Sequence, residues 1–206
     1  MIAIIDYGAG NLHSVKSALD FLGAESTITN ITAEIESASG VILPGVGSFK
    51  DAMQSMQKSG LVDAVKRAAT SGKPFLGICL GLQLLFDSSE ESPDTKGLGI
   101  LPGKVVKFPS IEGLKVPHIG WNSLEITQPN GLLKDLGSTS YVYFVHSYYL
   151  QADNQEVVAS NTDYGVKFNS SIQQENLCAV QFHPEKSGET GLKILSNFID
   201  MCGEGN

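Results

Sequence analysis

A cysteine, a histidine and a glutamate are spaced in this chain as the parts of a nucleophilic catalytic site. Cys79 stands between Gly77 and Gly81, directly after an apolar run. This G-x-nucleophile-x-G pattern is typical of a sharp strand-to-helix turn, in which the start of the helix favours a thiolate. Far along the chain, His183 and Glu185 end another apolar segment. A thiol attacks carbonyl carbon efficiently when a histidine takes its proton and a carboxylate orients that histidine.

Each motif also has a purely structural interpretation. A buried cysteine is commonly a small hydrophobic residue, and Gly77 and Gly81 are compatible with close helix–strand packing alone. The segment His183-Pro184-Glu185, taken alone, is typical of a surface turn stopped by proline. Together, however, the two motifs supply a nucleophile, a base and an orienting carboxylate in chain order. The combination therefore favours a catalytic triad.

These motifs resemble those of the class I, or triad, glutamine amidotransferases. Four further segments are similar to the glutaminase subunits of imidazole glycerol phosphate synthases, which act in histidine biosynthesis; the segments are 6–11, 44–47, 117–122 and 144–148. The resemblance runs from residue 2 to about residue 199. It implies an enzyme that hydrolyses glutamine to glutamate and ammonia. It also implies a heterodimer with a (β/α)₈-barrel subunit, which uses the ammonia to form imidazole glycerol phosphate and an aminoimidazole carboxamide ribotide.

Acyl transfer requires N–H donors that stabilise a tetrahedral oxyanion. The residue after the nucleophile, Leu80, is expected to give one backbone donor. The loop 44–47 follows an apolar run, and the resemblance points to Val46 and Gly47 for the second donor. The alternative for this loop is an ordinary glycine turn. Glycines on both sides of Val46 also widen the range of backbone angles, so one peptide could turn toward or away from the oxyanion.

The remaining substrate-binding candidates come from two segments. Gln83 lies four residues after Cys79, one turn along the same helix face, where it could hold the amino-acid end of glutamine. The resemblance places Ser147 and Tyr148 at the glutamine pocket. A buried amide and a half-buried strand are the structural alternatives.

Three residues are candidates for the partner interface. The resemblance places Asn11 there, on a turn that precedes a helix. Trp121 lies in a glycine-containing segment and suits an interface anchor, with core packing as the equal alternative. Lys186 directly follows the triad carboxylate, so its side chain is expected near the mouth of the site.

No cofactor or metal ion is expected. The turn at Gly8 and Gly10 resembles a dinucleotide fingerprint, but His13 stands where the third glycine is required. His118 and His146 are single histidines without a second ligand at metal spacing, so a structural or interfacial role is favoured.

Composition limits the class of protein. The 206 residues suit one domain spanning 1–206. A net charge of −8, from 14 basic and 22 acidic residues, and the lack of a basic stripe argue against a nucleic-acid partner. Three cysteines, without a C-x-x-C pair, indicate reduced thiols and a cytoplasmic protein rather than a disulfide scaffold. No signal peptide or membrane-spanning run is recognised.

Hydrophobic periodicity predicts an α/β fold. Apolar runs at 2–5, 26–29, 41–43 and 75–78 alternate with amphipathic helices that begin near Asn11, Ser48 and Leu61. This alternation predicts an open, mostly parallel, flavodoxin-like sheet flanked by helices on both faces. From 99 to 180 the chain is rich in Val, Tyr, Phe and Thr, which predicts antiparallel strands that extend or cover the sheet. A final helix is expected after His183.

Three other functions stay open at this level. The first is the glutaminase of another synthase, such as pyridoxal phosphate synthase, against which 44–47 and the Trp121 segment argue. The second is a cysteine peptidase or a deglycase-like hydrolase, against which Gln83 and the His183 segment argue. The third is a catalytically silent binding subunit, which would not need an intact triad.

Overall fold

The computed structural model describes residues 1–137 and 139–203. Its central sheet contains five parallel strands in the flavodoxin-like order β2-β1-β3-β4-β13, which confirms the predicted fold class. These strands are β1 (Ile2–Ile5), β2 (Ser26–Thr29), β3 (Gly40–Gly45), β4 (Phe75–Cys79) and β13 (Leu177–Val180). The strands β1, β3, β4 and β13 are buried throughout, as expected for a parallel sheet covered on both faces, whereas the edge strand β2 is only partly buried.

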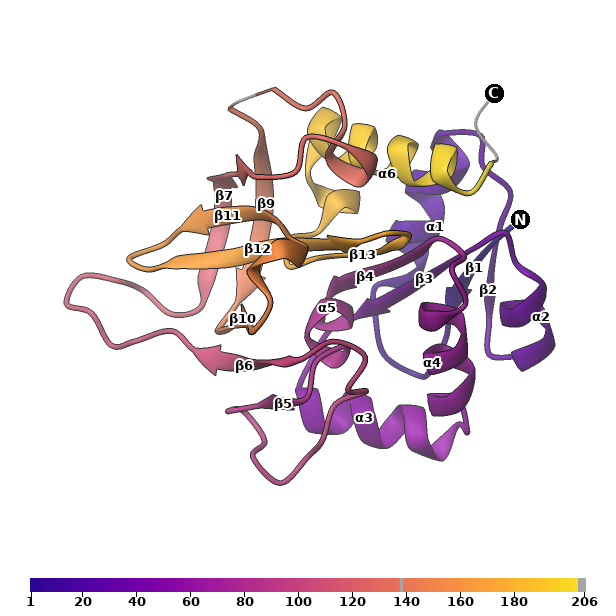
Figure 1. Cartoon of the computed structure of the whole chain (residues 1–206), viewed down its shortest axis with the longest axis horizontal. Coiled ribbons are helices and arrows are strands. Elements are labelled where there is room, and N and C mark those ends of the chain that lie inside the picture. Colours follow the sequence, from indigo (N-terminus) through magenta and orange to yellow (C-terminus); the bar gives the residue numbers. More distant parts are fainter. Residues whose placement is uncertain (138, 204–206) are drawn as a thin grey trace.

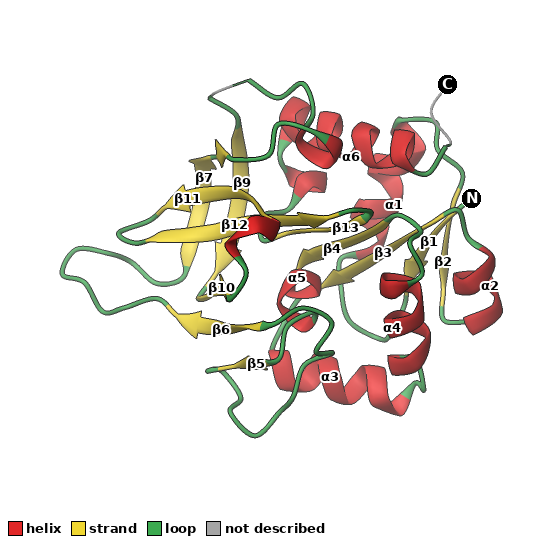
Figure 2. Ribbon diagram, in the orientation of Figure 1, coloured by secondary structure: helices red, strands yellow, loops and turns green. Residues whose placement is uncertain are grey.

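Helices cover both faces of this sheet (Figures 1 and 2). On one face lie α2 (Thr32–Ser37), α3 (Phe49–Lys58), α4 (Val62–Thr70) and α5 (Leu80–Leu84); on the other lie α1 (Leu12–Phe21) and α6 (Gly188–Met201). Successive residues of β1 alternate between the two cores: Ala3 and Ile5 pack toward α3 and α4, and Ile2 and Ile4 toward α1 and α6.

The antiparallel part of the fold both extends and covers the parallel strands, as predicted. The sheet continues from β13 through β12 (Lys167–Gln174), β10 (Tyr148–Ala152), β6 (Gly103–Lys107) and β5 (Ser88–Ser89), while β11 (Val158–Asp163) and β8 (Glu125–Ile126) branch from β12. A separate antiparallel pair consists of β7 (His118–Ser123) and β9 (Tyr141–His146). Short 3₁₀ helices lie at Gly131–Leu133, Gln155–Val157 and Pro184–Lys186.

One short helix was not predicted, and one helix start lacks the usual side-chain cap. The helix α2 was not predicted, because within its six residues only Ile35 is buried and no periodic pattern can form. Asn11 holds the N-cap position of α1, but its Oδ1 accepts a hydrogen bond from the Ser14 hydroxyl at 2.9 Å rather than from a helix N–H group. Across the described residues, no helix has the length and apolar character required to cross a membrane.

Candidate active site

Strand register brings the predicted site residues to one edge of the sheet. Gly45 at the end of β3 pairs with Cys79 at the end of β4, and Val180 at the end of β13 pairs with Ile78. The carboxyl ends of the three strands therefore meet, which is where open α/β sheets bind ligands. The loop after β3 and the segment after β13 consequently flank Cys79.

Cys79 occupies a strained turn. Its φ of 54° and ψ of −109° lie outside the regions that non-glycine residues ordinarily adopt. The two glycines permit this turn, because a Cβ on Gly81 would collide with the Leu43 carbonyl and one on Gly77 would lie 3.0 Å from the Gly81 backbone. The turn directs Cys79, which is 7% exposed, into a cavity.

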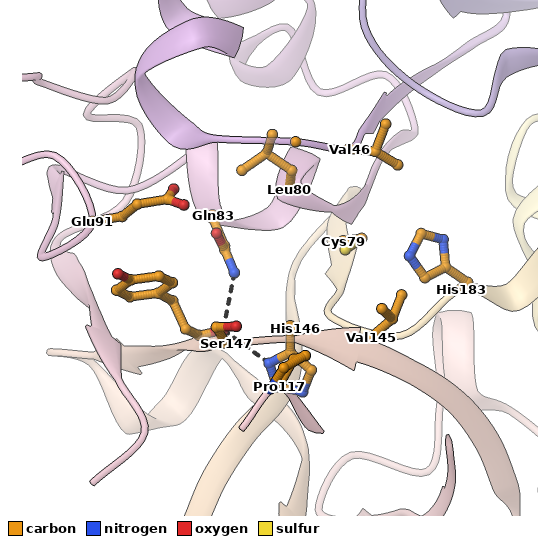
Figure 3. A pocket seen from close by; sticks show the side chains of 12 residues that line it. Val46, Cys79, Leu80, Gln83, Glu91, Pro117, Val145, His146, Ser147 and His183 are labelled. Carbon is orange, nitrogen blue, oxygen red and sulfur yellow. Dashed lines mark hydrogen bonds between the residues drawn. The ribbon is translucent and has the colours of Figure 1, made fainter. Parts of the chain in front are cut away.

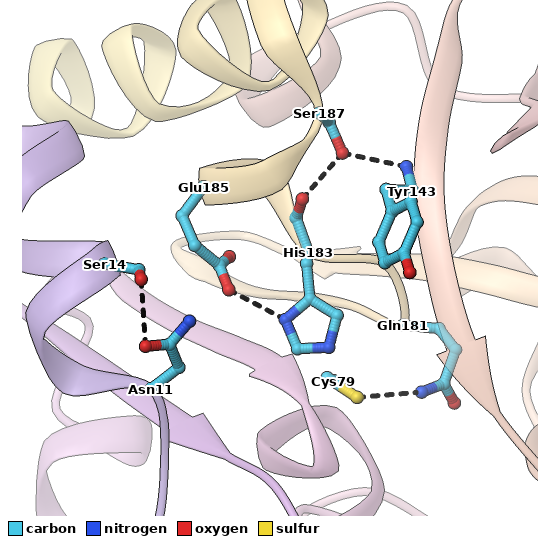
Figure 4. A network of polar contacts seen from close by, with 8 residues as sticks. All are labelled: Asn11, Ser14, Cys79, Tyr143, Gln181, His183, Glu185 and Ser187. Carbon is cyan, nitrogen blue, oxygen red and sulfur yellow. Dashed lines mark hydrogen bonds and ion pairs between the residues drawn. The ribbon is translucent and has the colours of Figure 1, made fainter. Parts of the chain in front are cut away.

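His183 and Glu185 form a buried ion pair. The 3₁₀ helix Pro184–Lys186 turns the chain so that His183 Nδ1 lies 2.8 Å from Glu185 Oε1, with the side chains 3% and 1% exposed. His183 Nε2 points toward Cys79 without completing a hydrogen bond to it (Figure 4). Burial lowers the pKa of His183, but interactions with Cys79 and then Glu185 outweigh it and raise the pKa to about 10. The arrangement thus favours an imidazolium beside the sulfur.

The backbone of His183 is clamped to β9. Its N–H donates to the Tyr143 carbonyl at 2.9 Å, and its carbonyl accepts from the Ser187 hydroxyl at 2.6 Å. The same Ser187 oxygen accepts from the Tyr143 N–H at 2.9 Å (Figure 4). Because Ser187 is 1% exposed, these bonds are shielded from water and hold the histidine in place.

A cavity of about 330 Å³ opens at Cys79 (Figure 3). Eight of the residues proposed for the site line it, and they are Val46, Gly47, Cys79, Leu80, Gln83, Ser147, Tyr148 and His183. Glu185 lies behind His183 and outside the cavity, as expected for a residue that orients the base. The described residues contain no group of three or more His, Cys, Asp or Glu side chains that could hold a metal ion.

The structure also places in the site residues that the sequence did not single out. Glu91 lines the cavity, and its Oε2 accepts a 2.7 Å hydrogen bond from the Phe49 N–H. Gln181 is fully buried, with Nε2 3.7 Å from Cys79 Sγ. The acidic run at 90–91 marked only a polar loop, and no local pattern relates Gln181 to the cysteine.

His118 and His146 form a buried pair rather than two separate histidines. His118 Nδ1 lies 3.0 Å from His146 Nε2, and His146 Nδ1 lies 2.8 Å from the Tyr148 carbonyl. Because that carbonyl only accepts, His146 carries its proton on Nδ1, and His118 donates to it. Burial lowers the pKa of His118 to about 4 and that of His146 to about 3, so both are neutral near pH 7.

The three residues proposed for the partner interface lie on separate elements. Trp121 on β7 is 56% exposed, so core packing is not its role, and its ring meets Tyr143 edge-on at 6.2 Å. Lys186 is exposed on the 3₁₀ helix after His183. Asn11 directs its amide nitrogen toward the Glu185 carboxylate (Figure 4).

Comparison with known proteins places this geometry in a family. Residues 3–202 match the family model for glutamine amidotransferase class-I. The chain is 53% identical over 200 residues to the imidazole glycerol phosphate synthase subunit HisH of Moorella thermoacetica, covering 97% of this chain and 94% of that protein. It is 52% identical over 201 residues to the protein of the same name from Listeria innocua, covering 98% and 96%.

Solved structures agree at the level of the fold. A crystal structure described as a glutamine amidotransferase superposes with a TM-score of 0.77 at 20% identity, covering 98% of this chain and all of that one. A structure of PurLQS from Thermotoga maritima gives a TM-score of 0.73 at 18% identity, covering 97% of both chains. The match to the family model and the identities of 53% and 52% to the two HisH proteins show the family. This chain therefore belongs to the class-I glutamine amidotransferases and, among them, to the HisH subunits of imidazole glycerol phosphate synthase.

Proposed function

We propose that this chain is the glutaminase subunit of an imidazole glycerol phosphate synthase and that Cys79 is its nucleophile. The observation that carries the proposal is the meeting of Cys79, His183 and Glu185 at one cavity, in a chain about half identical to HisH proteins over nearly its full length. The relatives' identity favours this reading over the glutaminase of another synthase. The reaction requires no resident metal or redox group, since thiol, imidazole and water suffice for amide hydrolysis.

The triad residues divide the proton and electron transfers. Cys79 Sγ attacks the side-chain carbonyl carbon of glutamine, and the imidazolium of His183 gives a proton to the departing nitrogen, which leaves as ammonia. The product is a γ-glutamyl thioester on Cys79. Water then attacks the thioester, His183 takes its proton, and glutamate leaves. Glu185 holds the imidazole through Nδ1 and stabilises its charged form in both steps.

Backbone N–H groups stabilise the tetrahedral oxyanion. Leu80 supplies the donor that follows the nucleophile, at the start of α5. The loop containing Val46 and Gly47 supplies the second, because it ends a neighbouring strand and lines the same cavity.

Polar side chains at the far side of the cavity bind the amino-acid end of glutamine. The NH₂ group of Gln83 donates both of its hydrogen bonds within the protein, to the Tyr148 carbonyl at 3.1 Å and to Gln181 Oε1 at 3.0 Å. Its own carbonyl oxygen is therefore the group offered to a ligand, and it suits the substrate ammonium. Glu91 lines the same region and supplies a compensating negative charge. Ser147 and Tyr148 close the pocket.

The ammonia passes to a second subunit. The names of the relatives describe one subunit of a synthase, and we propose that the other is a (β/α)₈-barrel that docks against Asn11, Trp121 and Lys186. We also propose that the complex works in the cytoplasm, where thiols such as Cys79 stay reduced.

Ammonia release tests this function directly. The chain, alone and with a candidate barrel subunit, is incubated with glutamine, and glutamate and ammonia are measured. We expect turnover that rises with the loaded partner and that Cys79→Ala abolishes. Cys79→Ala should still support synthesis by the assembled complex when ammonia is added. Normal glutamine turnover by Cys79→Ala, or no turnover by the native complex, would refute the proposal.

A further inference from the structure

The amide of Gln181 contacts the proposed nucleophile and has a fixed direction. Val180 pairs with Ile78, so the next residue on β13 is level with Cys79 on the neighbouring strand. Gln181 is fully buried there, with its backbone N–H bonded to the Ser170 carbonyl at 2.9 Å and its Nε2 3.7 Å from Cys79 Sγ (Figure 4). The side chain therefore has no access to water.

The direction of the amide follows from hydrogen-bond polarity. The Tyr148 carbonyl is only an acceptor, so the Gln83 group that faces it at 3.1 Å must be the NH₂ group (Figure 3). The same NH₂ group faces Gln181 at 3.0 Å, so Gln181 must present its oxygen to Gln83. The other end of the Gln181 amide, which faces Cys79, is therefore the NH₂ group.

The Tyr148 carbonyl, at which this series of hydrogen bonds begins, is itself held in place. His146 Nδ1 donates to Tyr148 O at 2.8 Å, and His118 supports His146 at 3.0 Å. Reversing the Gln181 amide would place its NH₂ group against the NH₂ group of Gln83, and reversing Gln83 as well would place the Gln83 oxygen against the Tyr148 carbonyl. The buried network therefore holds an N–H donor against the sulfur before any substrate binds.

We infer that Gln181 is a further catalytic residue of this site, which donates a hydrogen bond to the Cys79 thiolate and stabilises it for attack. The inference rests on the proposed function, since it takes Cys79 as the nucleophile. In this arrangement the thiolate receives charge stabilisation from two sides, from the His183 imidazolium and from the Gln181 amide. Gln83 then has two roles, because it offers its oxygen to the substrate and fixes the Gln181 donor with its nitrogen.

Two variants test the donor. Gln181→Met keeps the length and volume of the side chain and removes the N–H. Gln181→Glu keeps an oxygen for Gln83 and places an acceptor at the sulfur. Gln151→Met, on exposed β10 surface, is the matched control. The rate of Cys79 alkylation by iodoacetamide is followed by mass spectrometry from about pH 5 to 9, and glutamine kcat and KM are measured in the complex with the synthase partner.

A hydrogen bond to a charged group corresponds to about a tenfold to hundredfold effect. We expect Gln181→Met to slow alkylation at least about tenfold near pH 6, with the profile moved to higher pH and less difference at pH 9. The kcat should fall by a similar factor with KM nearly unchanged, Gln181→Glu should lose more, and Gln151→Met should match the native chain. Circular dichroism establishes that each variant is folded.

The outcomes separate this inference from the proposed function. If the native complex hydrolyses glutamine but a folded Gln181→Met or Gln181→Glu chain alkylates and turns over normally, the inference is wrong and the proposed function stands. A rate loss equal at every pH would show a structural role and would also overturn it. If native Cys79 is not alkylated preferentially and glutamine is not hydrolysed, the proposed function itself fails.

Discussion

His183 Nδ1 and Glu185 Oε1 lie 2.8 Å apart, and only Pro184 separates the two residues in the chain. Residues i and i+2 of an extended strand point to the same face but lie about 7 Å apart, and the short 3₁₀ helix at Pro184–Lys186 brings these two side chains closer. The Glu185 carboxylate is buried, and within the described residues its second oxygen has no hydrogen-bond partner. The pair is therefore built around one short charge-assisted bond.

Replacing Glu185 by glutamine should damage catalysis far more than binding. The amide has the same shape, but it cannot stabilise the imidazolium and it can favour the wrong tautomer of His183. We expect kcat to fall on the order of 10³-fold or more with little change in KM, as triads show when the orienting carboxylate is lost. Steady-state kinetics of the complex measure both constants. A change in KM alone would make Glu185 a binding residue.

Selective labelling should distinguish Cys79 from the other two thiols. Burial raises the pKa of Cys178 and that of Cys202 to about 12, so both stay protonated and unreactive near neutral pH. A glutamine-like electrophile, such as a diazo-ketone analogue, should therefore modify Cys79 alone, and peptide mass spectrometry locates the adduct. Equal modification of all three cysteines would contradict an activated nucleophile.

Gly47 is the position at which to test movement of the oxyanion loop. Tyr7 donates to the Pro44 carbonyl at 3.0 Å and fixes the start of the loop, and burial raises the pKa of Tyr7 further above its usual range. A Cβ on Gly45 would lie 2.8 Å from the Tyr7 oxygen, so Gly45→Ala should mainly destabilise the fold. Gly47 has φ of +93° and free space around it.

Alanine is strained at a φ of +93°, so Gly47→Ala should alter the loop although no neighbouring atom obstructs the new Cβ. We expect it to change the ratio of partner-stimulated to basal glutaminase activity about tenfold or more, since one oxyanion donor is worth about 3–4 kcal/mol. Thermal unfolding should be affected less than in Gly45→Ala. An unchanged stimulation ratio in Gly47→Ala would exclude this loop as the element that responds to the partner.

Trp121 should contribute to association and not to folding. Its side chain is 56% exposed in the isolated chain, so Trp121→Ala removes little buried surface. If it anchors the partner, truncation should weaken binding by about 2 kcal/mol or more, near a thirtyfold change in Kd. Titration calorimetry with the proposed partner subunit measures the affinity. Ile31→Ala, which removes another exposed apolar side chain at the start of α2, is the control that should bind normally.

The buried histidine pair should make the protein sensitive to mild acid. The pKa values of His118 and His146, about 4 and 3, lie below the 6.5 of an unfolded histidine. Their neutral forms therefore support folding fully above about pH 6.5, and this contribution is lost as the pH falls toward 4, because the unfolded chain takes up protons first.

Thermal unfolding at several pH values checks this expectation. The Tm of the native chain should fall between pH 6.5 and pH 4.5 more steeply than that of His118→Gln. The exposed residue His13 supplies the control, and His13→Gln should follow the native curve. Parallel curves for all three proteins would show that the pair does not couple protonation to unfolding.

Local patterns were sufficient to predict the strands β1 to β4, the turn at Cys79 and the proximity of His183 to Glu185. The reason is that these features depend on short-range constraints: apolar periodicity, glycines where a Cβ has no space, and a histidine and glutamate only two residues apart. The antiparallel extension was predictable as a class because β-branched and aromatic residues dominate 99–180, although its strand order was not.

Contacts between distant segments were decided by the tertiary structure. Gln181 meets a cysteine 102 residues away because β13 inserts beside β4 in one register, and its amide direction depends on a carbonyl on β10. Within the described residues β7 pairs only with β9, which leaves Trp121 exposed. Sequence patterns report the burial of one face of an element, whereas the direction of a buried amide depends on donors and acceptors that only the folded chain brings together.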